Sequence, residues 1–104
     1  MDRKEFETYL NANSRLVTIF RSQALAYQHN KNRQRSTSKK WSGTAVISAV
    51  NKMVSQFVDN VYDKLNANVK ENKLHPYESW VSFMETDEVL ENLEDTVAEI
   101  RFEE

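Results

Sequence analysis

The chain has 104 residues, of which 39% are hydrophobic and 29% charged, and its formal net charge is −2. This length and composition indicate one globular domain, residues 1–104, rather than a disordered segment. A single glycine, a single proline and no cysteine exclude a turn-rich β fold, a glycine-rich phosphate loop, disulfides and cysteine-ligated zinc. No apolar run approaches the roughly 18 residues of a membrane span, and the N-terminus lacks a signal-peptide pattern, so we expect a cytoplasmic protein without membrane contact.

The small net charge hides two oppositely charged regions. Residues 8–58 contain eight basic and no acidic side chains, whereas residues 59–104 contain 13 acidic and four basic ones. Such asymmetry indicates either a charged partner or two opposite surfaces that meet within the fold.

The first predicted helix spans residues 3–28. Asp2 and Glu5 have the spacing of a capping box, which places the helix start near Arg3. Apolar residues then recur on one helical face through Tyr27. The following segment, residues 29–40, contains no apolar residue and is rich in Asn, Ser and Thr, which favour turns, so we expect a basic loop there.

A long central helix is predicted over residues 43–72, with Ser42 as its N-cap. Its apolar residues cover about half the helix circumference, which is more than one neighbouring helix can cover. We expect residues 6–27 and 89–100 to cover this face together. The alternative is that a second copy of the chain takes the place of residues 89–100, which leaves a homodimer open.

Two shorter helices are predicted after the central one. Pro76 belongs in a first helical turn, and the apolar residues that follow it form a face over residues 76–84. A last helix over residues 87–102 has one apolar stripe and acidic residues on its remaining surface. The sequence therefore predicts an all-α fold, a small bundle of three to four helices around the long central helix.

The sequence offers few groups for catalysis. Its two histidines, His29 and His75, lie in the basic loop and just before Pro76, and no nucleophile–base pair or metal-binding motif accompanies them. Asp59 and Asp63 share a helix face but lack the further carboxylates and the histidine of a metal-binding bundle. We expect no enzyme activity, no cofactor and no metal.

The acidic last helix is the first candidate binding surface. A row of carboxylates on a rigid helix can contact a basic groove of another protein, including one that handles nucleic acids. Inhibitor and immunity proteins act in this way, which favours a non-enzymatic protein that regulates or inhibits a basic protein partner. The alternative is an ordinary solvated helix face. The predicted contact residues are Glu88, Glu91, Glu94, Asp95 and Glu99.

The basic loop is the second candidate, as a nucleic-acid-binding segment of an accessory protein. Several cations beside an aromatic side chain provide the phosphate contacts and the base stacking that sequence-independent binding requires. The alternatives are a solubilising loop and, for the aromatic residue, a hydrophobic staple with Val46. The predicted contact residues are Arg21, Lys31, Arg33, Arg35, Lys39, Lys40 and Trp41.

The tripeptide Trp41-Ser42-Gly43 lies between the two long predicted helices of this 104-residue chain. This arrangement resembles the Trp-X-Gly family of small secreted helical-hairpin proteins. The resemblance implies export by a specialised secretion system and dimerisation. The family's tail signal, a tyrosine followed four residues later by an acid, is not matched here, because Tyr77 leads to Val81.

Overall fold

The computed structural model describes residues 1–86 and 88–100. The predicted all-α bundle is confirmed, although it has more helices than the three to four predicted. No helix within these residues is long and apolar enough to cross a membrane. The helices are α1 (Arg3–Asn13), α2 (Leu16–Arg33), a short 3-10 helix η1 (Thr37–Lys39), α3 (Gly43–Asn68), α4 (Pro76–Thr86) and α5 (Val89–Ala98).

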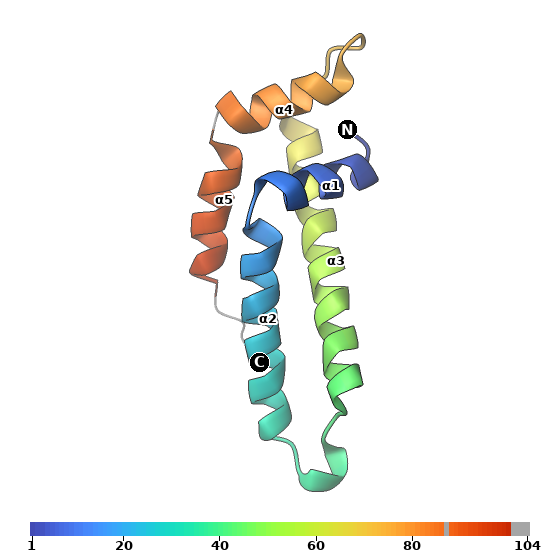
Figure 1. The fold of residues 1–104 in the computed structure, drawn as a ribbon, viewed down its shortest axis with the longest axis vertical. Helices are drawn as coiled ribbons and strands as arrows, with labels where there is room; N and C mark the ends of the chain where they lie inside the picture. The colour runs from blue at the N-terminus through green and yellow to red at the C-terminus, as the bar shows by residue number, and fades with distance from the viewer. Residues whose placement is uncertain (87, 101–104) are drawn as a thin grey trace.

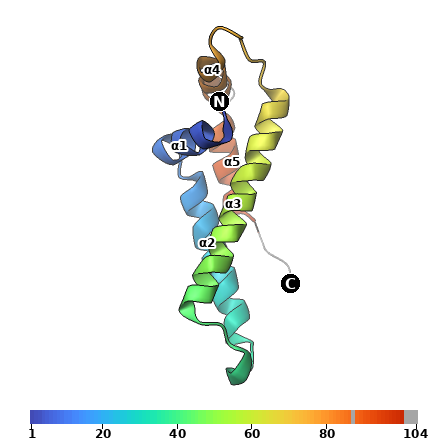
Figure 2. The same ribbon diagram turned by 90° about the vertical axis from the view of Figure 1, so that its right-hand side faces the viewer.

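Helices α2 and α3 form a long hairpin in a molecule that measures 57 × 23 × 21 Å (Figure 1). The other three helices gather at the end away from the α2–α3 connection: α4 crosses the end, α1 crosses the hairpin, and α5 runs beside α2 (Figures 1 and 2). We call α1, α4, α5 and the parts of α2 and α3 beside them the head. Residues 24–53, which extend away from it, are called the arm.

The prediction of one helix over residues 3–28 is wrong. Helix α1 ends at Asn13, Ser14 has extended backbone, and α2 begins at Leu16. The Ser14 hydroxyl accepts a hydrogen bond from the Leu16 backbone N–H at 3.0 Å, which stabilises the new helix start. The break turns α1 across the hairpin (Figure 1), where its Phe6 and Leu10 are fully buried.

The predicted basic loop begins too early. Helix α2 continues through residues 29–33, so residues 34–42 alone connect the hairpin, partly as η1. Lys31 and Arg33 lie in the last turn of α2. There they interact favourably with the negative end of the helix dipole, which offsets the low helix propensity of the asparagines beside them.

Three further helices differ from the predictions at one or both ends. Helix α3 ends at Asn68 instead of residue 72, α4 extends to Thr86 instead of residue 84, and α5 spans Val89–Ala98 within the predicted range 87–102. The backbone N–H of Val69 closes α3 by donating to the Leu65 carbonyl. Asp87 and residues 101–104, which the last prediction included, lie outside the described residues.

The predicted helix caps at Asp2 and Ser42 are confirmed. The backbone N–H of Glu5 donates to the Asp2 carboxylate at 2.7 Å, and the backbone N–H of Asp2 donates to the Glu5 carboxylate at 2.9 Å. The Ser42 hydroxyl accepts from the Ala45 backbone N–H at 3.1 Å. Each cap satisfies a backbone donor that the first helical turn leaves unpaired.

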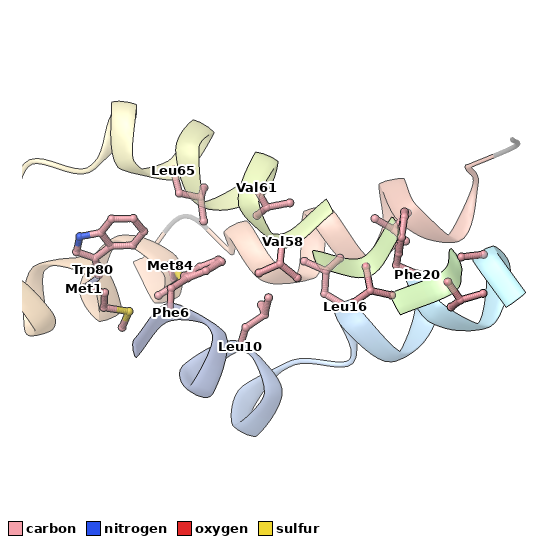
Figure 3. Packing of buried hydrophobic residues seen from close by; sticks show 14 residues of the cluster. Met1, Phe6, Leu10, Leu16, Phe20, Val58, Val61, Leu65, Trp80 and Met84 are labelled. Carbon is pink, nitrogen blue, oxygen red and sulfur yellow. The ribbon is translucent and has the colours of Figure 1, made fainter. Parts of the chain in front are cut away.

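The core is aromatic in the head and aliphatic in the arm. Trp80 is fully buried between α1 and α3 (Figure 3), and the Tyr62 ring stacks on it with a centroid distance of 5.1 Å. Phe20 and Phe57 stack at 4.1 Å where the arm leaves the head. Beyond this pair the buried apolar residues are small, namely Ala24, Val46, Val50 and Val54.

The last helix does not pack against the central helix in the way the sequence predicts. Helix α5 packs against α2 and α4, and its Cα atoms stay more than 8 Å from those of α3. The helix shared by α1, α3 and α5 is therefore α2, not the central helix α3. An apolar groove of about 280 Å³ runs between α3 and α5, lined mainly by Phe57, Val61, Leu65, Leu93, Val97 and Ile100.

Candidate binding surfaces

A cavity of about 260 Å³ opens on the head where α1, α4 and α5 meet. Four of the side chains around it are acidic and none is basic. We call it the acidic cleft, and it is lined by Tyr9, Asn13, Met84, Glu85, Glu88, Leu90, Glu91 and Glu94.

The acidic cleft contains part of the predicted acidic surface. Glu88, Glu91 and Glu94 lie on it: Glu91 and Glu94 are three residues apart and share one face of α5, and Glu88 is the N-cap of that helix. Asp95 and Glu99 do not line it. Glu85 of α4 and the two α1 residues, Tyr9 and Asn13, were not predicted to join this surface, because their positions depend on how the helices pack.

The break between α1 and α2 positions one wall of the acidic cleft. It brings Tyr9 and Asn13 of α1 opposite α5. The Ser14 hydroxyl donates to the Glu94 carboxylate at 3.0 Å, which joins the break directly to α5. Asn13 is exposed, and its side-chain amide donates to the Tyr9 carbonyl at 2.9 Å.

Glu88 has the left-handed backbone conformation, with φ of 50° and ψ of 37°. For a residue other than glycine this conformation costs about 1–2 kcal/mol. It lets the chain turn from α4 into α5, whose first helical hydrogen bond runs from the Asn92 backbone N–H to the Glu88 carbonyl at 3.0 Å. Because no glycine marks this turn, the sequence pattern gave no sign of it.

The acidic cleft has a strongly negative environment. Burial raises the pKa of Tyr9, and the nearby Glu85 carboxylate raises it further. The ion pairs of residues 1–86 and 88–100 join Met1 with Glu71, and Arg3 with Glu7 and Asp59, so no carboxylate of the cleft takes part in one. Within these residues, no three His, Asp or Glu side chains are grouped to hold a metal ion.

The predicted basic segment forms the tip of the arm, residues 29–42, which we call the basic tip. Its centre is the Asn32 side chain. The Asn32 side-chain oxygen accepts from the Trp41 backbone N–H at 2.8 Å and from the Arg35 guanidinium at 3.0 Å. Its amide nitrogen donates to the Trp41 carbonyl at 3.1 Å. These three hydrogen bonds hold the end of α2 against the start of α3.

Two of the predicted nucleic-acid contacts also support the basic tip itself. The Lys40 ammonium donates to the Asn32 and Arg33 carbonyls, at 3.1 and 3.0 Å, and so caps the end of α2. The Arg35 guanidinium lies 3.9 Å from the centroid of the Trp41 ring, in a cation–π contact. Trp41 nevertheless stays 43% exposed, whereas Val46, its predicted staple partner, is buried.

The other predicted cations are distributed over α2 and the connection. Arg33 and Lys39 are exposed at the basic tip, and the Lys31 ammonium lies 5.7 Å from the Tyr27 ring centroid. Arg21 lies about 18 Å from Arg33 along α2, given a rise of 1.5 Å per residue. Its guanidinium donates to the Asn51 side chain at 2.7 Å, so Arg21 does not belong to the basic tip.

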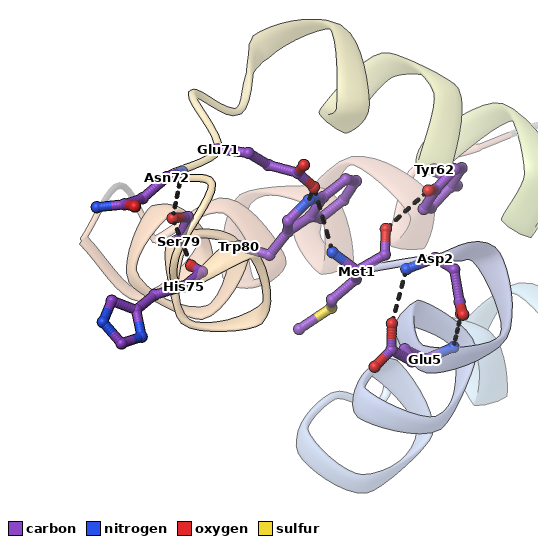
Figure 4. Close-up of polar contacts among 9 residues, drawn as sticks. All are labelled: Met1, Asp2, Glu5, Tyr62, Glu71, Asn72, His75, Ser79 and Trp80. Atoms are coloured by element: carbon purple, nitrogen blue, oxygen red, sulfur yellow. Dashed lines mark hydrogen bonds and ion pairs between the residues drawn. The ribbon is translucent and has the colours of Figure 1, made fainter.

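A polar cluster in the head was not predicted. The Met1 ammonium, 3.3 Å away, and the Trp80 indole N–H both donate to the Glu71 carboxylate, and the Tyr62 hydroxyl donates to the Met1 carbonyl at 2.8 Å (Figure 4). These donors lower the pKa of Glu71. The hydrogen bond from Trp80 has the larger effect and the hydrogen bond from the Met1 ammonium the next. The residues are far apart in the sequence, so no local pattern could show the cluster.

The two charged surfaces lie at opposite ends of the long axis (Figure 1). Trp41-Ser42-Gly43 lies in the connection between α2 and α3, with Gly43 as the first residue of α3. Comparisons of the chain with protein-family models, with curated proteins and with solved structures found no match.

Proposed function

We propose that the protein is a non-enzymatic, cytoplasmic binding protein that regulates or inhibits a basic protein partner through the acidic cleft. One observation carries the proposal: four carboxylates from α4 and α5 line a single cavity that has no basic side chain around it. An uncompensated charge in a concave site favours a ligand of opposite charge.

The chemistry of the acidic cleft fits a lysine or arginine side chain. Tyr9 and Leu90 offer apolar surface to the aliphatic part of such a side chain, while the carboxylates pair with its charged end. Glu94, already oriented by Ser14, is half-buried, so an ion pair with it is less screened than one on an open surface.

Inhibition follows if the bound residue belongs to a groove that normally holds a polyanion. Glu91 and Glu94 present two charges on one helix face, about 4.5 Å apart along the helix axis, and Glu88 adds a third charge at the N-cap of α5. A partner that handles nucleic acids has the matching basic groove, and the bound head would then exclude its ligand.

The test compares two variants that each remove three acidic charges. The cleft variant is Glu85→Gln, Glu88→Gln, Glu91→Gln. The control variant is Asp63→Asn, Glu78→Gln, Glu99→Gln, whose residues are exposed and do not line the cleft. Glu94 stays unchanged in both variants because its hydrogen bond with Ser14 supports the fold.

Each protein is immobilised and exposed to extract of the source cell at low and moderate salt. We expect the unmodified protein and the control variant to retain the same basic protein, and the cleft variant to lose it. Raising the salt should weaken the retained complex. If both variants capture the same proteins, the acidic cleft is not the binding site.

A further inference from the structure

The basic tip carries positive charge that the described chain does not neutralise. No acidic residue occurs between Thr8 and Val58, and no ion pair within residues 1–86 and 88–100 includes a base of this region. The three hydrogen bonds of Asn32 nevertheless hold the basic tip in one conformation. An ordered cationic surface whose charges are not paired with carboxylates of the described residues is suited to bind an external anion.

The cations of the basic tip have two different roles. Lys40 caps α2 and Arg35 lies on the Trp41 ring, so both hold the structure of the tip. Arg33 and Lys39 are exposed; the hydrogen bond between Arg33 and the Asn30 side chain is long, at 3.4 Å. These two side chains can therefore reach outward to phosphate groups.

Trp41 adds the second element of a polyanion site. Its ring is 43% exposed at the end of the arm, beside the Arg35 guanidinium. An aromatic ring among cations binds nucleic acid by stacking on a base while the cations contact the backbone. A base is free to stack in this way in a single strand, whereas in a duplex it is covered by its neighbours.

We infer that the basic tip binds single-stranded nucleic acid, with a base stacked on Trp41 and phosphates bound by Arg33 and Lys39. The acidic cleft does not oppose this contact, because it lies toward the other end of a molecule 57 Å long. Charges separated by more than about 8 Å of physiological salt solution are largely screened from each other. The inference is independent of the function proposed for the acidic cleft.

The first experiment measures the binding of a labelled oligothymidine of about 16 nucleotides by fluorescence anisotropy, between about 50 and 200 mM salt. The tip variant is Arg33→Gln, Lys39→Gln. The matched control, Lys4→Gln, Lys73→Gln, removes two exposed cations that lie outside the arm.

We expect affinity to fall as salt rises. The tip variant should weaken binding and reduce the slope of log affinity against log salt by about 1.4, since each phosphate contact on a single strand contributes about 0.7. The control variant should keep the slope of the unmodified protein. Absence of binding at the lowest salt, or an equal effect of the two variants, would overturn the inference.

The second experiment uses the two tryptophans as reporters. Trp80 is fully buried, so stacking on Trp41 should quench the fluorescence of Trp41 alone. Trp41→Phe should abolish quenching while retaining binding, and Trp41→Ala should weaken binding about tenfold, because stacking on an aromatic side chain is lost.

Quenching that persists in Trp41→Phe would contradict the stacking contact. The alternative is that the basic tip binds a second copy of the chain. Sedimentation of the protein without nucleic acid measures whether it forms such a dimer. A salt-sensitive dimer that the tip variant dissociates, together with no oligothymidine binding, would overturn the inference in favour of self-association.

Discussion

The head and the arm share helices α2 and α3 but are held together differently. In the head, α1 and α4 enclose Phe6, Tyr62 and Trp80, whose rings contact one another at centroid distances of 5.1 to 5.8 Å. In the arm, two helices alone meet, and they bury small side chains such as Ala24 and Val50. Large aromatic residues become useful only where additional helices close the space around them.

The head and the arm also differ in how their charged side chains are paired. The ion pairs that the structure describes all include Met1 or Arg3, at the N-terminal end of the head. The arm instead relies on hydrogen bonds around Asn32, and none of the ion pairs among the described residues includes one of its cations. Stability is therefore concentrated in the head, and unneutralised charge is concentrated in the arm.

Trp80→Ala should produce the largest loss of stability. Trp80 is fully buried and donates to Glu71, so we expect the free energy of unfolding to fall by about 3–5 kcal/mol, as for other buried aromatic residues. Trp41→Ala at the basic tip should cost less than about 1 kcal/mol, since it mainly removes an exposed cation–π contact. Urea unfolding measures both. Equal losses would contradict the contrast between head and arm.

Asn32→Ala should loosen the basic tip while leaving the head intact. The substitution removes three hydrogen bonds, and we expect a loss of about 1–2 kcal/mol. Hydrogen exchange of the Trp41 backbone N–H, which donates to Asn32, is the direct measurement. Asn30→Ala, which removes one long hydrogen bond, is the control. Unchanged protection of Trp41 in Asn32→Ala would show that the hydrogen bonds of Asn32 do not order the basic tip.

Gln28→Leu should stabilise the arm. Gln28 is buried, its amide nitrogen donates to the Met53 sulfur at 3.3 Å, and its side-chain oxygen has no hydrogen-bond partner within the described residues. Leucine removes this buried polar group, so the free energy of unfolding should rise by about 1 kcal/mol. Thermal unfolding tests the change against the exposed-site control Gln34→Leu. A loss of stability would mean that the amide is satisfied in solution.

The head should lose stability in acid through Glu71. Its pKa is lowered from 4.5 in the folded protein, so its contribution is present above this value and is lost as pH falls through the folded pKa. Glu71→Gln should therefore be less stable near neutral pH and should show a shallower loss of stability between about pH 6 and pH 3. Urea unfolding at several pH values tests this prediction, with Glu78→Gln as the control. Parallel curves for Glu71→Gln and the unmodified protein would refute it.

The features that could be predicted are those that depend on residues close together in the sequence. The Asp2–Glu5 capping box, the Ser42 cap and the start of α4 at Pro76 are all local, and all are confirmed. The break at Ser14 was missed because the apolar residues on its two sides fit one helical face, although Asn13 interrupts that face. Its signal was the serine itself, whose hydroxyl can bond backbone N–H groups next to a helix start.

The acidic cleft was predictable only in part. The spacing of Glu91 and Glu94 places them on one face of α5, and helix periodicity shows this. Their neighbours Tyr9 and Glu85 come from other helices, and the turn into α5 depends on the left-handed backbone of Glu88. None of these features follows from a local pattern.

The contact between Met1 and Glu71 has a consequence for the order of folding during synthesis. It joins residues 70 positions apart, whereas the arm closes on itself within residues 24–53. The head can close only once Trp80 has left the ribosome, 18 residues after Tyr62. At about 5–20 residues per second, Tyr62 then stays without Trp80 for roughly one to four seconds, and Phe6 waits longer still. That interval is when the nascent chain most needs protection from aggregation.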